Sequence, residues 1–459
     1  MLDPAANRGR GFGRARHVST EPEIGVAVGR VRVAEYLLCD WEVPMRREPD
    51  GPAGSGETAL RAYRLVLTQL AFRRFWLALL LVMLADEMMR TSLVWYVYAA
   101  TGSSQAVGLL MVCLTGPILV SGLLAGWLLD RFPRAWVMAA DTGFRAALLA
   151  AVAGLVAADA GGVPLFYLVA AVQGALLMVL LAGAPAAIAE LVAEPSRGAA
   201  NALESVGFAV AGAAGPFLAG QLIAHGQRSA PLLVSALCYA GFALAVRGMR
   251  IGGGERAGRA AEKIPLRASG LLDPAIVVIT AMFVVFNVGT GLFAVWLPVV
   301  VADRLDGSAA TYGSLLSVNG LGLTAGALAA GLVRGAGRLG LAIVVAQVLS
   351  GLALLALAFR VPVPLAYVAV LCFGFCSGPM TVWAQTIRMR IVAPQWRGRA
   401  FASLRMIMQS GRPIGGAIAG TALAHLSLGV CVVATTAIVA VPALIGALHP
   451  ALRARDARR

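Results

Sequence analysis

Lysine is almost absent from this sequence. Its 459 residues include one lysine, Lys263, in the context Ala-Glu-Lys-Ile-Pro. A phosphate-binding loop of the type Gly-x-x-x-x-Gly-Lys-Ser/Thr needs a lysine directly after its second glycine, and no such lysine exists here. The sequence therefore excludes ATP hydrolysis through a P-loop.

Histidine and cysteine are few and scattered. There are four histidines and six cysteines, with no Cys-x-x-Cys spacing. Most of the cysteines lie in apolar stretches, where they behave as small packing side chains. Cys372 and Cys376 share a helix face, but no histidine or carboxylate stands near them in the sequence to complete a metal site. Without His-Glu-x-x-His, Asp-Asp-x-x-Asp or a Ser-His-Asp set, we expect no metal, no cofactor and no enzymatic activity.

Charged residues of any kind are scarce, at 13%, whereas 59% of the residues are apolar. Apolar runs of about 20 residues are long enough to cross a bilayer, and in hydrocarbon the backbone must form helices. The sequence therefore predicts an all-α membrane protein of twelve transmembrane helices in two sets of six. The predicted spans are 75–98, 106–129, 135–157, 163–189, 200–224 and 230–249, then 274–300, 310–333, 339–359, 363–387, 400–423 and 426–448.

The net charge is +15, and the basic residues are divided unevenly between the odd- and even-numbered loops. The odd-numbered loops hold only Arg228, Arg304 and Arg360. Because basic residues mark the cytoplasmic side, we expect a multi-pass protein of the plasma membrane with both termini in the cytoplasm, and no nucleic-acid partner. The arginine- and alanine-rich composition is typical of a bacterial genome of high GC content. In or beside even-numbered loops lie Arg131, Arg134, Arg197, Arg247, Arg250, Arg256, Arg259, Lys263, Arg267, Arg334, Arg338, Arg388, Arg390, Arg397 and Arg399.

Composition also divides the chain into segments. Arginine, glycine and proline dominate the beginning of the chain, and its mildly apolar stretch is too interrupted by charge to be a signal peptide. Met45 is an alternative start, so the sequence leaves open whether residues 1–44 belong to the native protein. The expected segments are a disordered extension (1–57), an interfacial amphipathic helix (58–74), a first bundle (75–250), a flexible cytoplasmic linker (251–272), a second bundle (273–449) and a basic cytoplasmic tail (450–459).

The two predicted bundles repeat each other. A set of seven residues recurs 200 positions further along the chain. Duplicated six-helix units are typical of secondary transporters, in which the substrate site lies between the halves. Arg197, Gly198, Ala202, Gly215, Gly220, Ala224 and His225 recur as Arg397, Gly398, Ala402, Gly415, Gly420, Ala424 and His425.

A short charged turn joins the second and third predicted spans. It reads Gly126-Trp-Leu-Leu-Asp130-Arg131-Phe-Pro-Arg134. The pattern resembles the loop between helices 2 and 3 of the major facilitator superfamily of secondary transporters. In that superfamily the loop controls conformation, its aspartate meeting the positive N-terminal end of helix 11. The resemblance implies this role for Gly126, Asp130, Arg131 and Arg134.

Within the superfamily, the chain is most similar to the drug:proton antiporters that include macrolide and enterobactin exporters. It departs from them at Pro133, which replaces a glycine, at Ala170, where many carry an arginine, and at Arg334, in place of an acid. The residues that carry the resemblance are Asp86, the run Tyr98…Thr101-Gly102-Ser103, Asp130-Arg131…Arg134, Asp141…Arg145, Asn201 after Arg197, the antiporter-like helix 5 glycines and proline (Gly212, Gly215, Pro216, Gly220), and Pro394…Arg397-Gly398-Arg399.

Ionisable residues inside the spans are functional candidates, because each costs about 2.5–3.5 kcal/mol to insert. Asp86, Glu87 and Arg90 lie halfway along the first span. Arg90 can neutralise one acid by local pairing, which leaves the other to carry a proton; static pairing of both acids with arginines is the alternative. Asp141 and Arg145, four residues apart, are expected to form an embedded pair.

Two arginines of the eleventh span lack an acidic neighbour in the sequence. No acid occurs between Asp306 and Asp456. Arg405 can reach the cytoplasmic rim or Asp130. Arg412 lies near mid-bilayer, and three partners remain open for it: the surplus acid of the first span, an anionic group of the substrate, or carbonyls freed near Pro413. The first is favoured.

Uncharged polar residues in the spans more often join helices than bind substrate. The resemblance implies a monomeric exporter of a lipophilic or amphipathic small molecule, with protons as the coupling ion. An uptake permease of the same fold is the alternative, and a membrane-embedded enzyme or scaffold is disfavoured. Substrate identity is not readable from the sequence. The uncharged cavity candidates are Gln173, Asn287, Asn319 and Gln385.

Overall fold

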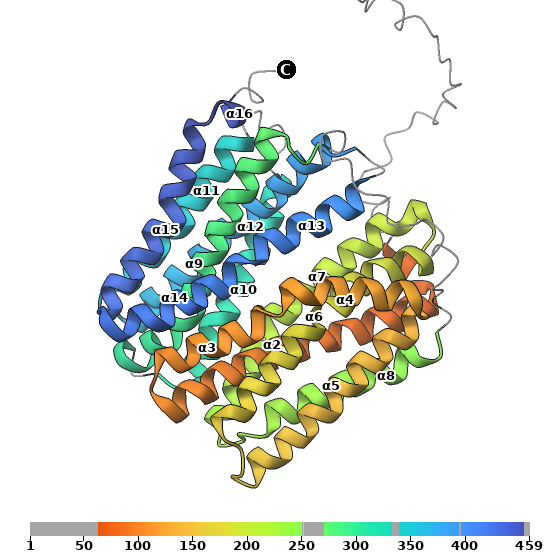
Figure 1. Cartoon of the computed structure of the whole chain (residues 1–459), viewed down its shortest axis with the longest axis horizontal. Coiled ribbons are helices and arrows are strands. Elements are labelled where there is room, and N and C mark those ends of the chain that lie inside the picture. Colours follow the sequence, from red (N-terminus) through yellow and green to blue (C-terminus); the bar gives the residue numbers. More distant parts are fainter. Residues whose placement is uncertain are drawn as a thin grey trace, which may run out of the picture. The chain divides into compact units, whose positions relative to one another are not determined.

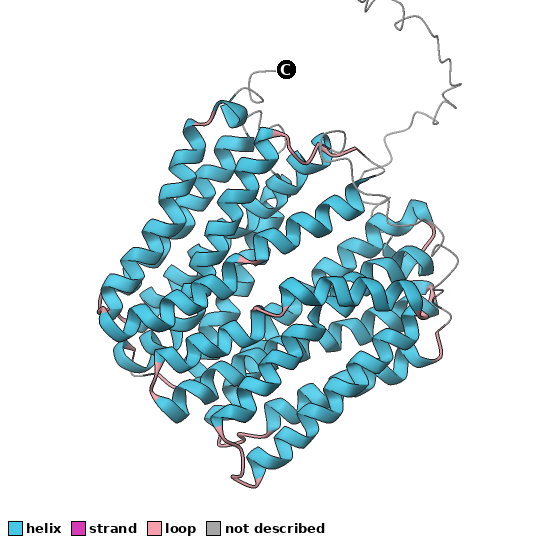
Figure 2. Cartoon of the chain, in the orientation of Figure 1, coloured by secondary structure: helices cyan, strands magenta, loops and turns pink. Residues whose placement is uncertain are grey.

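The apolar stretches fold as helices (Figures 1 and 2). The computed structural model describes residues 63–249, 251, 270–305, 307–332, 339–393 and 396–453, and every regular element among them is helical. The first half comprises α2 (Leu70–Thr101), α3 (Ser104–Thr115), α4 (Ile118–Arg131), α5 (Arg134–Ala157), α6 (Val163–Leu191), the short η1 (Glu194–Ser196), α7 (Arg197–Ala224) and α8 (Ala230–Arg247).

The second half repeats this order. Residues 63–68 are also helical, directly before Gln69 and α2. The second half comprises α9 (Pro274–Arg304), α10 (Ala309–Leu332), α11 (Leu339–Leu354) with η2 (Leu355–Ala358), α12 (Val363–Ile391), α13 (Arg397–Gln409), α14 (Gly411–His425), α15 (Leu428–Leu448) and α16 (Pro450–Arg453).

Ten helices within the described residues are long and apolar enough to span a membrane. They include α3 and α4 as one span, and α11 with η2 as another. The charged α2 and the α13–α14 pair complete the predicted set of twelve. Large apolar side chains such as Leu123, Leu244 and Leu328 are about 70% exposed, as expected of surfaces that face lipid rather than water. The observed ends agree with the predicted spans to within a few residues.

Part of the predicted segmentation lies outside the described residues. This applies to the extension 1–57, to most of the linker 251–272 and to most of the basic tail 450–459. The proposed interfacial helix 58–74 is described only from residue 63, and its second part continues directly into α2. All described residues belong to one compact unit, Gly54–Arg459.

Two spans are interrupted where the sequence carries proline. The second span breaks at Gly116 and Pro117, between α3 and α4, and the eleventh breaks at Ser410, between α13 and α14. Pro413 has no N–H to offer the carbonyl four residues before it, which weakens the helix at that break. The sequence predicts both spans as continuous helices, and the structure corrects this at the two breaks.

The internal repeat is visible in the backbone contacts of two arginines. Arg197 begins α7, and its guanidinium donates to the carbonyls of Ala189 (2.8 Å) and Val192 (3.2 Å) at the end of α6. Arg397 begins α13 and donates in the same way to Met389 (2.7 Å) and Val392 (3.1 Å) at the end of α12. Each arginine satisfies carbonyls that the preceding helix leaves without partners.

The halves contact each other along two seams built from glycine. A Cβ added to Gly108 of α3 would lie 2.7 Å from the carbonyl oxygen of Gly416 in α14. A Cβ added to Gly220 of α7 would lie 2.5 Å from the carbonyl oxygen of Ala309 in α10. Both seams lie toward the end of the molecule that carries the odd-numbered loops. Small residues permit such close backbone approach within membranes.

The other end is joined less tightly. The helices α4 and α13 continue α3 and α14, but only a few of their residues come close together (Figure 1). A Cβ added to Gly126 of α4 would meet no atom within 4 Å. The close backbone packing of α3 on α14 therefore does not continue into α4 and α13, whereas that of α7 on α10 extends to mid-helix, where a Cβ added to Gly320 would lie 2.6 Å from the carbonyl oxygen of Gly212.

Candidate functional site

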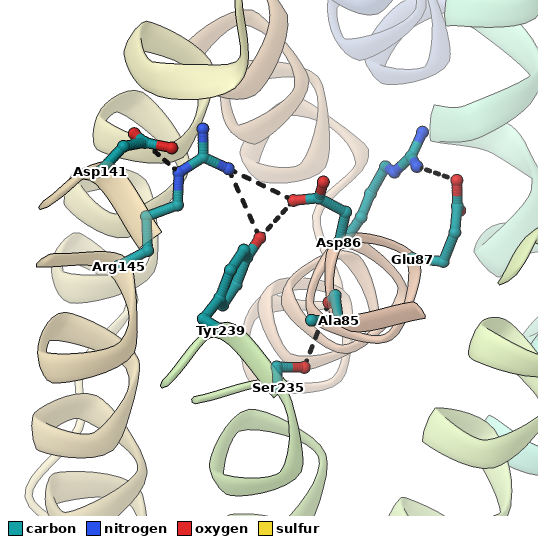
Figure 3. A network of polar contacts seen from close by, with 8 residues as sticks. Ala85, Asp86, Glu87, Asp141, Arg145, Ser235 and Tyr239 are labelled. Atoms are coloured by element: carbon teal, nitrogen blue, oxygen red, sulfur yellow. Dashed lines mark hydrogen bonds and ion pairs between the residues drawn. The ribbon is translucent and has the colours of Figure 1, made fainter. Parts of the chain in front are cut away.

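The charges of α2 lie near the middle of that 32-residue helix. Asp86 and Glu87 are consecutive, so their side chains leave the helix about 100° apart. Asp86 points toward α5 and α8, whereas Glu87 points away from them (Figure 3). One helix thus supplies a carboxylate to each of two different polar groups.

The first group, here called the Arg145 cluster, consists of Asp86, Asp141, Arg145 and Tyr239 (Figure 3). Arg145 of α5 is fully buried; its Nε lies 3.3 Å from Asp141 Oδ1 and its Nη1 lies 3.4 Å from Asp86 Oδ1. The Tyr239 hydroxyl donates to the same Asp86 oxygen and accepts from Arg145 Nη1 at 3.5 Å. The cluster joins α2, α5 and α8.

This cluster contains one more carboxylate than cation. Asp141 Oδ2 and Arg145 Nη2 are buried and have no hydrogen-bond partner among the described residues. A buried carboxylate oxygen without a donor is costly when ionised. With both aspartates ionised, the cluster therefore carries one negative charge more than its arginine balances.

The second group begins with the pair of Glu87 and Arg90, which form an ion pair one turn apart on α2. Their side chains are 30% and 37% exposed, far more than those of Arg145 and Asp141. A Cβ added to Gly215 of α7 would lie 2.5 Å from the Cβ of Glu87. Gly215 therefore fixes how close α7 comes to this acid.

Arg412 extends the second group into the other half of the molecule. Its Nε donates to Asn287 Oδ1 of α9 at 3.1 Å. Among the described residues, no carboxylate lies within ion-pair distance of its guanidinium. The ion pair with an acid of the first span that the sequence favoured is therefore absent from this conformation; an amide takes that place.

The structure gives both acids of α2 an arginine partner, which is the alternative that the sequence left open to a surplus acid on the first span. Arg90 takes Glu87, as local spacing permits, but Asp86 pairs with Arg145. The excess carboxylate arises because Asp86 and Asp141 share one arginine. Nothing in the local spacing of α2 could reveal this, since Tyr239 is 153 positions from Asp86.

The residues of the charged turn occupy the surface at the end of α4. Asp130 and Arg131 are exposed, and Arg131 lies 5.8 Å from the ring centroid of Trp127. Arg134 forms an ion pair with Glu190 of α6. No ion pair joins Asp130 to a described residue, and Arg405 interacts electrostatically with Glu204 of α7 rather than with Asp130.

The uncharged candidates differ in their surroundings. Gln173 is buried with no hydrogen-bond partner for either side-chain atom, and the same holds for Asn319 Oδ1. Gln385 is half-buried on α12. Among the antiporter-like residues of α7, Gly220, Pro216 and the backbone of Gly212 pack against α10, although a Cβ at Gly212 itself would meet nothing within 4 Å.

Several residues of these groups were missed by sequence reasoning. Tyr239, Glu190 and Tyr312 contribute polar contacts but carry no local motif. Arg388 was assigned to the loop arginines, yet it is only 4% exposed. It lies 5.1 Å from the Phe283 ring centroid and contacts the Met408 sulfur at 3.0 Å. The only sequence signal that Arg388 is buried was its position after the partly polar segment Gln385-Thr-Ile.

No group of three metal-ligating side chains occurs within the residues that the structure describes.

Comparison with known proteins identifies the architecture. The sequence model of the Major Facilitator Superfamily matches residues 75–416. The solved structure of a mutant of the nucleoside transporter NupG is 13% identical, with a TM-score of 0.65, over 82% of this chain and 99% of its own. A POT family transporter in complex with a thioalcohol-conjugated peptide is 11% identical, with a TM-score of 0.65, over 82% and 94%. At these identities the likeness shows the fold alone. No curated protein matches the chain.

Proposed function

Because this chain belongs to the major facilitator superfamily, we propose that it exports a small amphipathic molecule from the cell in exchange for protons. Members of that superfamily are transporters and not enzymes, and the chain is a multi-pass membrane protein. In the proposal the protein is a monomer of a bacterial plasma membrane, with both termini in the cytoplasm. Its partners are the substrate, protons and the lipid bilayer.

The Arg145 cluster is the observation that carries the proton coupling. Two carboxylates share one buried arginine, and one carboxylate oxygen lacks a donor. Loss of a proton from this cluster would leave a second negative charge inside the membrane, where charges are expensive. Protonation and deprotonation therefore change the relative stability of conformations that expose the cluster to different sides.

Export rather than uptake is supported by the helix 5 residues. Gly215, Pro216 and Gly220 resemble an antiporter signature, and they line the contacts of α7 with α2 and α10. Because these helices pack backbone to backbone, without interdigitated side chains between them, they can separate and return along this seam. In the proposal this seam closes the outer side while the substrate enters from the cytoplasm.

Proton exchange can be measured in inverted membrane vesicles that contain the protein. Respiration acidifies the lumen, and a pH-sensitive dye reports protons released when a candidate amphipathic compound is added. We expect release with the wild-type protein and background release with the double variant Asp86→Asn, Asp141→Asn. The matched control is Asp159→Asn, an exposed loop position with φ 52° that asparagine also tolerates.

Two results would contradict the proposal. Undiminished proton release from the double variant would place coupling outside the Arg145 cluster. Proton movement in the same direction as the compound would indicate an uptake permease of the same fold. Membrane content of each variant, measured by blotting, separates lost coupling from lost insertion.

A further inference from the structure

Arg412 places a positive charge deep in the interface between the halves. It is the second residue of α14, which packs here against the middle of α9. A Cβ added to the preceding Gly411 would lie 3.0 Å from the Cβ of Asn287 and 2.9 Å from the backbone nitrogen of Val288. The arginine is half-buried and has one described partner, the Asn287 amide oxygen at 3.1 Å.

The contact of Asn287 with α14 resembles a contact in the first half of the chain. Gly411 meets the Cβ of residue 287, the carbonyl of residue 284 and the nitrogen of residue 288. In the first half, Gly215 meets the Cβ of residue 87, the carbonyl of residue 84 and the nitrogen of residue 88. The 200-residue repeat pairs Gly215 with Gly415 and not with Gly411, so the two contacts are similar without being equivalent positions. At these two glycine contacts the second half has an amide and the first half has a carboxylate.

The amide partner leaves the charge of Arg412 uncompensated. Glu87 is already paired with Arg90. Arg90 repels Arg412 more strongly than Glu87 attracts it, so the ion pair does not compensate the charge of Arg412. Together Glu87, Arg90, Asn287 and Arg412, here called the Arg412 site, carry a net charge of +1. An unpaired cation at this depth is expensive unless a ligand or another group compensates it.

Aromatic side chains from both halves lie beside the site. Trp95 of α2 stacks on Tyr312 of α10, with ring centroids 5.7 Å apart and planes 26° apart. Tyr312 is buried, whereas Trp95 is half-exposed. Tyr312 also interacts electrostatically with Arg90 and Glu87. Trp95, on the same helix as Glu87 and Arg90, therefore offers a partly exposed flat apolar surface.

We propose that the Arg412 site binds the anionic group of the transported molecule, a carboxylate attached to an aromatic or otherwise apolar body. This inference rests on the proposed transport function and names its substrate class. The guanidinium offers two terminal nitrogens for a bidentate carboxylate. The Asn287 amide holds Nε and fixes the orientation of the guanidinium.

Binding can be tested without transport, at one pH, on the full-length protein in detergent. The probes are 2-naphthoate, indole-3-acetate and cinnamate, each compared with its primary amide. Thermal unfolding with and without each probe gives the stabilisation that bound ligand confers. We expect at least one carboxylate to raise the unfolding temperature while its amide does not.

Variants connect the response to the site. Arg412→Gln should weaken binding of the active carboxylate about tenfold or more, the usual cost of a lost charged hydrogen bond. Asn287→Asp should weaken it similarly because the new carboxylate occupies Arg412, while the ligand-free unfolding temperature is retained or raised. The matched control Arg390→Gln, at an exposed position on α12, should bind as the wild type does.

The proposal is overturned if no carboxylate stabilises the protein, if amides stabilise it equally, or if Arg412→Gln retains the full response. The double variant Asp86→Asn, Asp141→Asn should keep the carboxylate response, since those residues lie outside the Arg412 site. A failure of proton exchange therefore leaves this binding intact. Conversely, a protein that binds no carboxylate can still exchange protons, so that result overturns the carboxylate proposal without contradicting proton exchange.

Discussion

At the scale of single residues, Asp86 and Glu87 illustrate how one position along a helix changes chemistry. Asp86 shares a buried arginine with Asp141 and accepts from Tyr239. Glu87, one residue later, pairs with Arg90 near the second half of the molecule. In our proposals, the arrangement at Asp86 binds and releases a proton, whereas the ion pair at Glu87 exchanges its partners. Proton coupling and substrate binding therefore use different faces of α2 in these proposals.

Two glycines of α7 allow a residue-scale prediction. Gly215→Ala places a Cβ 2.5 Å from the Cβ of Glu87, so the helices must separate or Glu87 must shift. Overpacking of this kind costs about 1–3 kcal/mol, and we expect transport in vesicles to fall by about tenfold. Gly212→Ala, three residues earlier, meets nothing within 4 Å and should transport normally. Equal loss in both variants would show that the effect is not contact with Glu87.

At the scale of elements, the interruptions within two of the spans affect how the halves contact each other. The α3–α4 and α13–α14 spans are each interrupted, and their outer parts, α3 and α14, form a glycine seam. The inner parts are joined by a softer contact: a Cβ on Gly122 of α4 would lie 3.0 Å from the flexible Met406 sulfur of α13. The same two spans therefore combine a close contact between backbones with a deformable one.

The orientation of α8 gives an element-scale prediction. The arginine asymmetry places the loop before α8 outside and the loop after it inside. In a cysteine-free background, Gln227→Cys should react with an impermeant maleimide in intact cells, whereas Gly248→Cys should react only after permeabilisation. Both positions are exposed, so access to solvent is matched. Labelling of position 248 from outside would invert the topology and with it the direction of export.

At the scale of the whole molecule, the repeated halves differ in charge. The first half embeds the carboxylates Asp86, Glu87 and Asp141, whereas Arg388 and Arg412 in the second half have no described carboxylate in ion-pair contact. One attraction therefore crosses between the halves, from Glu204 of α7 to Arg405 of α13, whereas the attraction of Glu87 for Arg412 is opposed by Arg90. The Glu204–Arg405 attraction favours association of the halves.

The Glu204–Arg405 attraction supports a prediction at this scale. Arg405→Glu should slow transport by a few fold, because a partly exposed pair contributes about 1 kcal/mol and reversal turns attraction into repulsion. Adding Glu204→Arg should restore part of the rate. Vesicle transport of one compound by the four proteins measures the coupling. A double variant no better than Arg405→Glu would mean that the two side chains act independently.

The amino-acid sequence by itself determined the twelve helices, their division into two repeats and the helix that carries the acids. The length and charge of an apolar stretch are properties of contiguous residues. The recurrence of Arg197 at Arg397 could be recognised in the sequence, and both residues begin a helix in the same way. The sequence also identified Asp141 and Arg145, whose side chains meet at 3.3 Å on a single helix.

Tertiary structure decided which charges meet. Local spacing predicts pairs on one helix, but Asp86, Arg145 and Tyr239 come from α2, α5 and α8. Likewise, the sequence favoured an acid of the first span as the partner of Arg412, whereas the packing of α14 on α9 gives it Asn287. A helix fixes the angle at which a side chain leaves it, whereas the neighbour that receives the side chain depends on how separate helices pack.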